Sequence, residues 1–231
     1  MTSRNFSLED LETLKQWDTP TICNGLELIV PERRAIGFTT GNMVAADKKL
    51  APMVGLARVG TMRAKEAPRS PVAERADWYD YVATADLPTV VVMQDLDDQP
   101  GYGAIWGEVH TLVHQSLGAL GCVTNGSFRD TDMLAPGFQI IASKIVPSHA
   151  HSHFVDFGRP VNILGMQASH DDIIHADHHG AVVIPPEAVR RLPDAIELVM
   201  RREKVIMDVC RDPSFTPAKL REALRHAKEI H

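Results

Sequence analysis

The segment from Gly101 to Asp132 constrains the fold of this chain more than any other part of the sequence. It reads GYGAIWGEVHTLVHQSLGALGCVTNGSFRDTD. Apolar residues at helical spacing predict a helix over 104–117, and the apolar run 121–124, closed by an Asn-Gly turn, predicts a short buried strand. Ligands bind open α/β sheets at the carboxyl ends of strands and against helix N-termini. We therefore expect the two ends of this segment to meet at one edge of a sheet.

The rest of the chain fits one α/β domain covering residues 1–231, with helices at both ends. Pattern and capping signals predict strands at 52–59 and 89–94, and short strands separated by Gly, Pro and Asp across 138–184. The other predicted helices are a first one opening at Ser7 and running to about 17, a second following Pro20, and three more over 71–83, 194–210 and 217–228.

Composition excludes several classes of protein. The net charge of -6 argues against general affinity for nucleic acid or anionic membranes, which require a basic face. The three cysteines show no paired, metal-type spacing, which is typical of reduced thiols in a cytoplasmic protein. The longest apolar runs, near 90–93 and 181–184, are too short to cross a bilayer. We expect a cytoplasmic protein with no nucleic-acid or membrane partner.

Three residues at the two ends of the central segment could carry chemistry. Glu108 lies near the start of the predicted helix, and Arg129-Asp130 follows the strand. Free N–H groups at a helix start bind carboxylates, and an arginine can hold a carboxylate or enolate oxygen with two donors. An aspartate is a hard oxygen ligand that suits Mg²⁺. Together these residues predict a site for a small 2-oxo carboxylate, although an Arg-Asp pair after a turn can also be a surface ion pair or a helix cap.

The same segment resembles the family that includes 4-hydroxy-4-methyl-2-oxoglutarate aldolase and the regulator of ribonuclease activity A. Aldolase members carry an acidic residue, twenty residues, and then Arg-Asp, and here twenty residues separate Glu108 from Arg129-Asp130. Trp106-Gly107, the run 121–126 and the stretch 170–185 also resemble the family, and the similarity extends from about 19 to 203. The regulator branch lacks the acidic residue, so Glu108 favours the enzymes.

The resemblance implies both a fold and a reaction. The fold would be an α/β domain like the swivelling phosphohistidine domain, in α/β/β layers with helical N- and C-terminal extensions, assembled as a homotrimer or homohexamer. The reaction would be Mg²⁺-dependent (or Mn²⁺-dependent) aldol cleavage of a 4-hydroxy-2-oxo acid, of the 4-hydroxy-4-methyl-2-oxoglutarate type, to pyruvate. Oxaloacetate decarboxylation would be a side activity. The alternatives are another lyase on the same scaffold, such as a sugar-acid dehydratase or decarboxylase, and a non-catalytic regulator of ribonuclease.

The resemblance also implies a role for each matching residue. Asp130 would be the direct metal ligand, Arg129 would contact the substrate's keto oxygen, and Glu108 would orient a metal-bound water for proton transfer. The substrate carboxylate would be held by the N–H groups of Val109, His110 and Thr111, and a neighbouring subunit would contribute Glu203. The family's usual Ser-Asp-Ala segment has Asn24 in place of aspartate here, which leaves the substrate open.

A run of histidines is a second candidate metal site. His149, His151 and His153 alternate along the chain and would share one face if extended. Three imidazoles on one face could bind Zn²⁺ or another transition metal. The other interpretation is a polar loop or strand edge at the mouth of the cleft or at a subunit interface, because neighbouring ligands on one strand rarely complete a tetrahedron.

Two further groups of polar residues are expected to border the site. Asp95, Asp97 and Asp98 do not fit a calcium-binding loop, and we expect a solvated loop there. His110 and His114 lie four residues apart on the predicted helix, and we expect both to be half-buried or to line the cleft.

Overall fold

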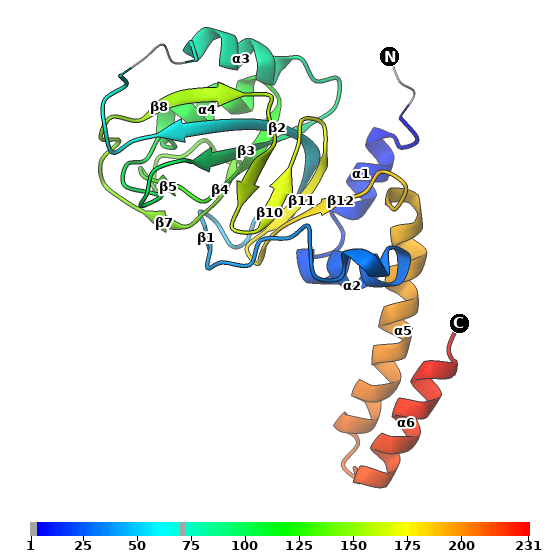
Figure 1. The fold of residues 1–231 in the computed structure, drawn as a ribbon. Helices are drawn as coiled ribbons and strands as arrows, with labels where there is room; N and C mark the ends of the chain where they lie inside the picture. Colours follow the sequence, from blue (N-terminus) through cyan, green and yellow to red (C-terminus); the bar gives the residue numbers. More distant parts are fainter. Residues whose placement is uncertain (1–3, 70–72) are drawn as a thin grey trace.

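A curled eight-stranded sheet forms the body of the protein (Figure 1). The computed structural model describes residues 4–69 and 73–231. The strands lie in the order β1-β6-β4-β3-β2-β11-β12, and β8 pairs with the far end of β2. Their bounds are β1 Val44–Ala45, β2 Met53–Arg63, β3 Thr89–Asp95, β4 Ala119–Thr124, β6 Gln139–Ala142, β8 His153–Phe157, β11 Ile173–Asp177 and β12 Gly180–Ile184.

Strands β2, β3, β4 and β6 are parallel, so their carboxyl ends share one edge of the sheet. Helix α3 (Arg75–Ala83) connects β2 to β3, and α4 (Glu108–Ser116) connects β3 to β4. A crossover helix runs back along the strands, so the N-terminus of α4 lies at the edge where β3 and β4 end. The predicted meeting of the two ends of the central segment is therefore confirmed.

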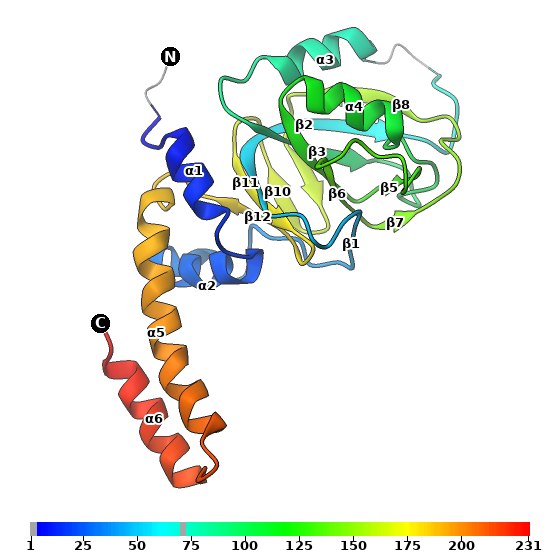
Figure 2. The same ribbon diagram turned by 180° about the vertical axis from the view of Figure 1, so that it is seen from behind.

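The sheet lies between two different layers. Helices α3 and α4 cover one face (Figure 2), where Trp78 packs against Val91, Met93 and their neighbours. A hairpin of β9 (Val161–Ile163) and β10 (Met166–Ala168) covers the other face. A small parallel pair, β5 (Ser127–Phe128) and β7 (Lys144–Ile145), extends the edge beyond β4. These layers confirm the expected α/β/β arrangement.

Helices from both ends of the chain pack together at the β11–β12 side of the sheet. A third apolar cluster joins them, with Leu11, Ile22 and Leu192 among its fully buried residues. Beyond this contact, the C-terminal helical hairpin projects away from the body (Figures 1 and 2). The elements are α1 Leu8–Leu14, α2 Thr19–Ile29, the 3₁₀ turns Pro31–Arg33 and Val189–Arg191, α5 Leu192–Arg211 and α6 Pro217–Glu229.

Side-chain caps explain where three of the α-helices begin. Ser7 and Asp10 form a reciprocal capping box at α1, and the side chains of Asp18 and Thr216 cap α2 and α6. The predicted helix over 71–83 begins at Arg75, and Pro71 lies outside the described residues. Within the ranges that the structure describes, no helix is both long and apolar enough to cross a membrane.

The prediction that the central helix begins at 104 was wrong, because α4 begins at Glu108. Ahead of it, the N–H of Ala104 donates to the carbonyl of Ser148 at 2.9 Å, and Trp106 forms a parallel bridge with Phe128. These contacts come from segments distant in sequence and hold 104–107 extended. Apolar spacing alone could not reveal them.

Candidate active site

The candidate site forms where the start of α4 meets the chain that leaves β5. The N–H of Arg129 donates to the carbonyl of Trp106 at 3.0 Å, a hydrogen bond that belongs to the parallel bridge between Trp106 and Phe128. One step further, the N–H of Glu108 donates to Oδ2 of Asp130 at 3.2 Å. Two segments separated by twenty residues are thereby fixed side by side, and the three residues singled out from the sequence lie together.

Gly107 makes this close approach possible. A Cβ atom at this position would lie 2.5 Å from Oδ2 of Asp130, a distance that a real Cβ does not tolerate. Asp130 itself adopts a positive φ of 56°, a conformation that aspartate enters more readily than most residues. Because Gly107 has no side chain and Asp130 has a positive φ, the carboxylate of Asp130 lies directly against the N-terminus of α4.

Arg129 brings an unsatisfied donor to the same place. Its Nη1 lies 3.1 Å from Oδ1 of Asp130. Its Nε is buried, and no acceptor within the described ranges reaches it. Nε1 of the fully buried Trp106 is in the same situation. Buried N–H groups in folded proteins almost always have a partner. The site is therefore short of oxygen acceptors, which a carboxylate or keto substrate would supply.

The first turn of α4 offers further donors. A helix leaves its first N–H groups without intrahelical partners. The N–H of Glu108 is taken by Asp130, and the N–H of Thr111 donates to the carbonyl of Gly107 at 3.0 Å. Within the described ranges, the N–H groups of Val109 and His110 have no hydrogen-bond acceptor, so two of the three N–H groups expected from the sequence are available to a ligand.

The loop before α4 is held by the side chains of Asn125 and Asp95, each of which bonds to backbone groups, and sequence reasoning missed this role. The amide of Asn125 accepts from the N–H of Asp95 at 2.7 Å and donates to the carbonyl of Asp95 at 3.0 Å. The carboxylate of Asp95 accepts from the N–H groups of Asp97 and Gly101. The expectation of a solvated loop was wrong for Asp95 and Asp97, which are 2% and 8% exposed. An aspartate directly after an apolar strand was the signal that could have revealed this role.

A comparison with models of known protein families shows which family this chain belongs to. The model of the RraA-like family, described as Aldolase/RraA, matches residues 19–183. The chain belongs to the RraA-like family. The resemblance found in the sequence is thereby confirmed, and the matched region contains the whole of the site formed by Glu108, Arg129 and Asp130. No curated protein matches the chain significantly.

Solved structures share the fold of this RraA-like chain. A protein from Pseudomonas syringae pv. tomato is 18% identical, with a TM-score of 0.70 over 98% of this chain and 95% of the other. Streptomyces coelicolor RraAS2, described as an unusual member of the RNase ES inhibitor RraA family, is 20% identical, with a TM-score of 0.68 over 87% and 98%. A protein described among novel cellulases from gut-associated microbes is 17% identical, with a TM-score of 0.71 over 88% and 90%. At these identities the likeness establishes the fold alone.

Of the two histidines on α4 of the RraA-like chain, His110 is half-buried as expected, whereas His114 is more deeply buried than expected. His114 is fully buried, where it accepts from Nε1 of Trp78 at 2.8 Å and lies 2.6 Å, through Nδ1, from the carbonyl of His110. Burial lowers the pKa of His114 to about 4 and that of His110 to about 3, and the charge of Arg129 acts on His110 in the same direction. Both imidazoles are therefore neutral near pH 7, and His114 ties α3 to α4.

Glu203 does not join the site within one chain. It lies on the exposed part of α5, beside a groove that Trp17, Met200 and Met207 also line. Helix α5 leads away from the sheet, whereas α4 lies against it (Figure 1). A role for Glu203 in catalysis would require a second subunit to bring it to the site.

Of the alternating histidines, His149 and His151 are exposed, and His153 is half-buried at the start of β8. Nδ1 of His149 lies 2.7 Å from the carbonyl of Ala150, and Nδ1 of His153 lies 2.7 Å from the carbonyl of His151. In the described part of the chain, these three imidazoles do not form a cluster with metal-ligand distances. The geometry favours the polar-loop interpretation.

Changing His149, His151 and His153 together to alanine is therefore expected to leave the fold intact and the turnover of any substrate at a substantial fraction of the parent's. Within the described ranges, the imidazoles of His149 and His153 bond only to neighbouring carbonyls, so little else depends on them. The measurement is turnover together with zinc content by elemental analysis. One equivalent of zinc in the parent that is missing from the triple variant would contradict the interpretation.

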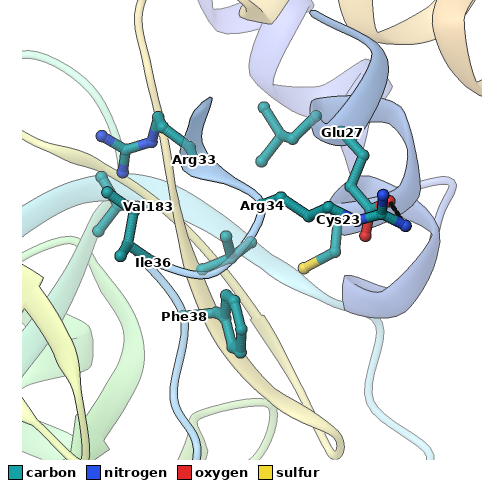
Figure 3. A pocket seen from close by; sticks show the side chains of 9 residues that line it. Cys23, Glu27, Arg33, Arg34, Ile36, Phe38 and Val183 are labelled. Atoms are coloured by element: carbon teal, nitrogen blue, oxygen red, sulfur yellow. Dashed lines mark ion pairs between the residues drawn. The ribbon is translucent and has the colours of Figure 1, made fainter. Parts of the chain in front are cut away.

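A small pocket lies between α2, the turn after it and β12 (Figure 3). It encloses about 130 Å³ and is lined by Cys23, Phe38 and Val183, with Arg34 paired to Glu27 at its rim. Burial raises the pKa of the Cys23 thiol to about 11, and the nearby carboxylates of Glu27 and Asp177 act in the same direction. A thiol with so high a pKa is a poor nucleophile at neutral pH, so this pocket offers no covalent chemistry.

Proposed function

We propose that this RraA-like protein is a Mg²⁺-dependent lyase that cleaves a 4-hydroxy-2-oxo acid and releases pyruvate. The observation that carries the proposal is the contact between the start of α4 and Arg129-Asp130. It gathers an anion-binding helix end, an arginine with a free donor and a carboxylate at one point. These are the groups that recognition of a 2-oxo carboxylate requires.

The carboxylate of Asp130 fits a magnesium ion. Its side chain is partly exposed, and each of its oxygens accepts one hydrogen bond, from Glu108 N–H and Arg129 Nη1. A carboxylate has about four acceptor positions, so lone pairs remain for a cation. Mg²⁺ commonly takes one or two protein carboxylates and fills its other positions with water and substrate. When bound, it would polarise the substrate's keto oxygen and stabilise negative charge there.

The chain's own residues supply substrate binding and proton transfer. The N–H groups of Val109 and His110 would hold the substrate carboxylate at the positive end of the α4 dipole. Arg129 would donate from its free Nε to the oxygen that becomes the enolate oxygen. The water beside Glu108 would accept the C4 hydroxyl proton as the C3–C4 bond breaks, so that C4 leaves as a carbonyl compound and the bonding electrons pass to C3 as pyruvate enolate. Glu108, at the first helical position, would hold the water that protonates C3.

The same site would also decarboxylate oxaloacetate. Loss of CO₂ from a 2-oxo acid with a carboxylate at C3 passes through the same pyruvate enolate. The residues that stabilise one enolate therefore stabilise the other. A homotrimer or homohexamer would place Glu203 of one subunit near the site of its neighbour, and the proposal includes such an assembly.

Two other functions compete with this proposal. A sugar-acid dehydratase or another decarboxylase could use the same metal and arginine, but a dehydratase would release water and keep the carbon chain intact. A regulator that acts by protein contact would need Asp130 only as a cap for α4 and Arg129 only as its ion-pair partner. The fold shared with Streptomyces coelicolor RraAS2 is compatible with that role. Of these functions, only regulation by protein contact would be unaffected by removal of the metal.

Chelation is expected to abolish turnover, and Mg²⁺ or Mn²⁺ is expected to restore it. A site built on one carboxylate binds Mg²⁺ weakly, because most of the ligands are water. EDTA followed by gel filtration should therefore remove the metal completely. The measurement is pyruvate release before chelation, after it and after addition of each ion. Full activity in the metal-free protein would contradict the assignment of Asp130.

A further inference from the structure

Three potential metal ligands meet at the turn between β11 and β12, away from the candidate active site. Asp177 ends β11, Gly180 begins β12, and His178 and His179 form the tip of the hairpin. One ligand atom from each of Asp177, His178 and His179 lies within 4.8 Å of the other two. Among the residues that the structure describes, no other group of three or more His, Cys, Asp or Glu side chains has metal-ligand spacing.

The carboxylate of Asp177 is fixed in place before any ion arrives. It is 3% exposed, and Oδ2 accepts from the N–H of Thr19, the first residue of α2, at 2.9 Å. Oδ1 accepts from the N–H of His179 at 2.8 Å. Burial works against the charged form, but these backbone hydrogen bonds hold the pKa of Asp177 below its usual value. Such supporting hydrogen bonds are typical of carboxylates that ligate metals.

The two imidazoles converge on this carboxylate. Nδ1 of His179 lies 3.1 Å from Oδ1 of Asp177, and the rings of His178 and His179 have centroids 3.9 Å apart. In a tetrahedral zinc site with bonds of about 2.0–2.1 Å, neighbouring ligand atoms are about 3.3 Å apart. The Asp177–His179 pair already has nearly this separation. A small side-chain rotation of the exposed His178 would bring the third ligand to the same distance.

We propose that Asp177, His178 and His179 bind a divalent transition-metal ion such as Zn²⁺ at the β11–β12 turn. Two imidazoles and one carboxylate select Zn²⁺, Co²⁺, Ni²⁺ or Cu²⁺ over Mg²⁺, which prefers oxygen ligands. Three protein ligands leave one position for water or an external ligand. The site is chemically distinct from the magnesium site proposed at Asp130 and does not depend on it.

Binding of the metal ion would also stabilise the packing of the N-terminal helices against the sheet. Asp177 holds the start of α2 through Thr19, and the Oγ1 of Thr19 lies 3.0 Å from Nδ1 of the buried His175. An ion on Oδ1 leaves these contacts intact and adds a link between the carboxylate and the tip of the turn. A ligand that binds only the folded chain stabilises it, so the melting temperature should rise with the ion concentration.

The test is a titration of the tag-free, metal-free full chain with Co²⁺ as probe. We expect visible d–d absorption that saturates at one ion per chain, is displaced by Zn²⁺ and is unaffected by excess Mg²⁺. His178→Ala combined with His179→Ala should weaken binding by about 100-fold or more, because it removes two of three ligands. The matched control changes the exposed His149 and His151 to alanine and should bind as the parent does.

Fold and activity are measured on the same samples. Circular dichroism melting checks that the double variant is folded. If the double variant does not fold, His178→Ala alone, which removes one exposed ligand, takes its place and should also weaken Co²⁺ binding. Pyruvate release with Mg²⁺ should be unchanged in these variants, which separates this site from the one at Asp130. Absence of a saturable Co²⁺ spectrum in the parent would overturn the proposal. Equal affinity in the parent and the His178 variants would do the same.

Discussion

Changing Glu108 to glutamine is expected to lower turnover by about 10²–10⁴-fold, the usual contribution of a general acid–base group. Glutamine keeps the size of the side chain and can still hold a water, but it cannot pass on a proton. Asp130, Arg129 and the N–H groups of α4 are untouched, so Mg²⁺ and pyruvate should still bind. The measurements are pyruvate release for the rate and calorimetry for the two ligands.

A purely structural role for Glu108 predicts a different pattern. An acidic residue in the first turn of a helix stabilises it by about 0.3–1 kcal/mol through the helix dipole. Asp194→Asn is the matched control, because Asp194 is an exposed acidic residue in the first turn of α5. If both variants lose a little thermal stability and both keep the parent rate, Glu108 acts only on the helix and the catalytic role is rejected.

Changing Arg129 to lysine is expected to cost about 10²-fold or more in turnover, comparable to the loss of one oxyanion donor. Lysine keeps the charge but loses the planar set of N–H donors, including the buried Nε that has no acceptor in the described chain. The loss should fall mainly on kcat, since negative charge develops on the keto oxygen as the C3–C4 bond breaks and is weak in the bound substrate. Steady-state kinetics with the best substrate measures it.

Arg159→Lys is the control for this substitution. Arg159 forms an exposed pair with Asp156 at 3.0 Å, the kind of surface ion pair that contributes little to stability. This variant should keep the parent rate. If Arg129→Lys stays within a few-fold of the parent as well, Arg129 is no more than the ion-pair partner of Asp130.

The contact between the start of α4 and Arg129-Asp130 could be predicted from the sequence, because it follows from the order of a helix and a strand that are adjacent along the chain. A helix followed at once by a buried strand must return to the edge where it began, which brings Glu108 beside Arg129-Asp130. An α/β domain with helices at both ends was likewise predictable from apolar spacing and capping residues, whereas the α/β/β layering was implied by the family resemblance. The start of α4 was not, because the bridge between Trp106 and Phe128 depends on tertiary contact.

Buried polar residues account for the remaining differences. Asp95 and Asp97 look like members of a solvated acidic loop, yet both are buried. The carboxylate of Asp95 accepts from N–H groups of its own loop, and that of Asp97 accepts from the N–H groups of Ala64 and Lys65, which follow β2. His114 is buried because Trp78, on another helix, donates to it. A sequence pattern shows which residues can form such hydrogen bonds but not which partners the fold will bring to them.

The most direct test is pyruvate release from 4-hydroxy-4-methyl-2-oxoglutarate by the purified chain, with and without Mg²⁺. Cleavage of the C3–C4 bond in this substrate gives two pyruvate molecules, so product and consumed substrate should appear in a ratio of two to one. A panel of other 4-hydroxy-2-oxo acids extends the test to related substrates. The account predicts Mg²⁺-dependent pyruvate release from at least one member of the panel. A folded, Mg²⁺-loaded protein that releases no pyruvate from any of them would contradict it.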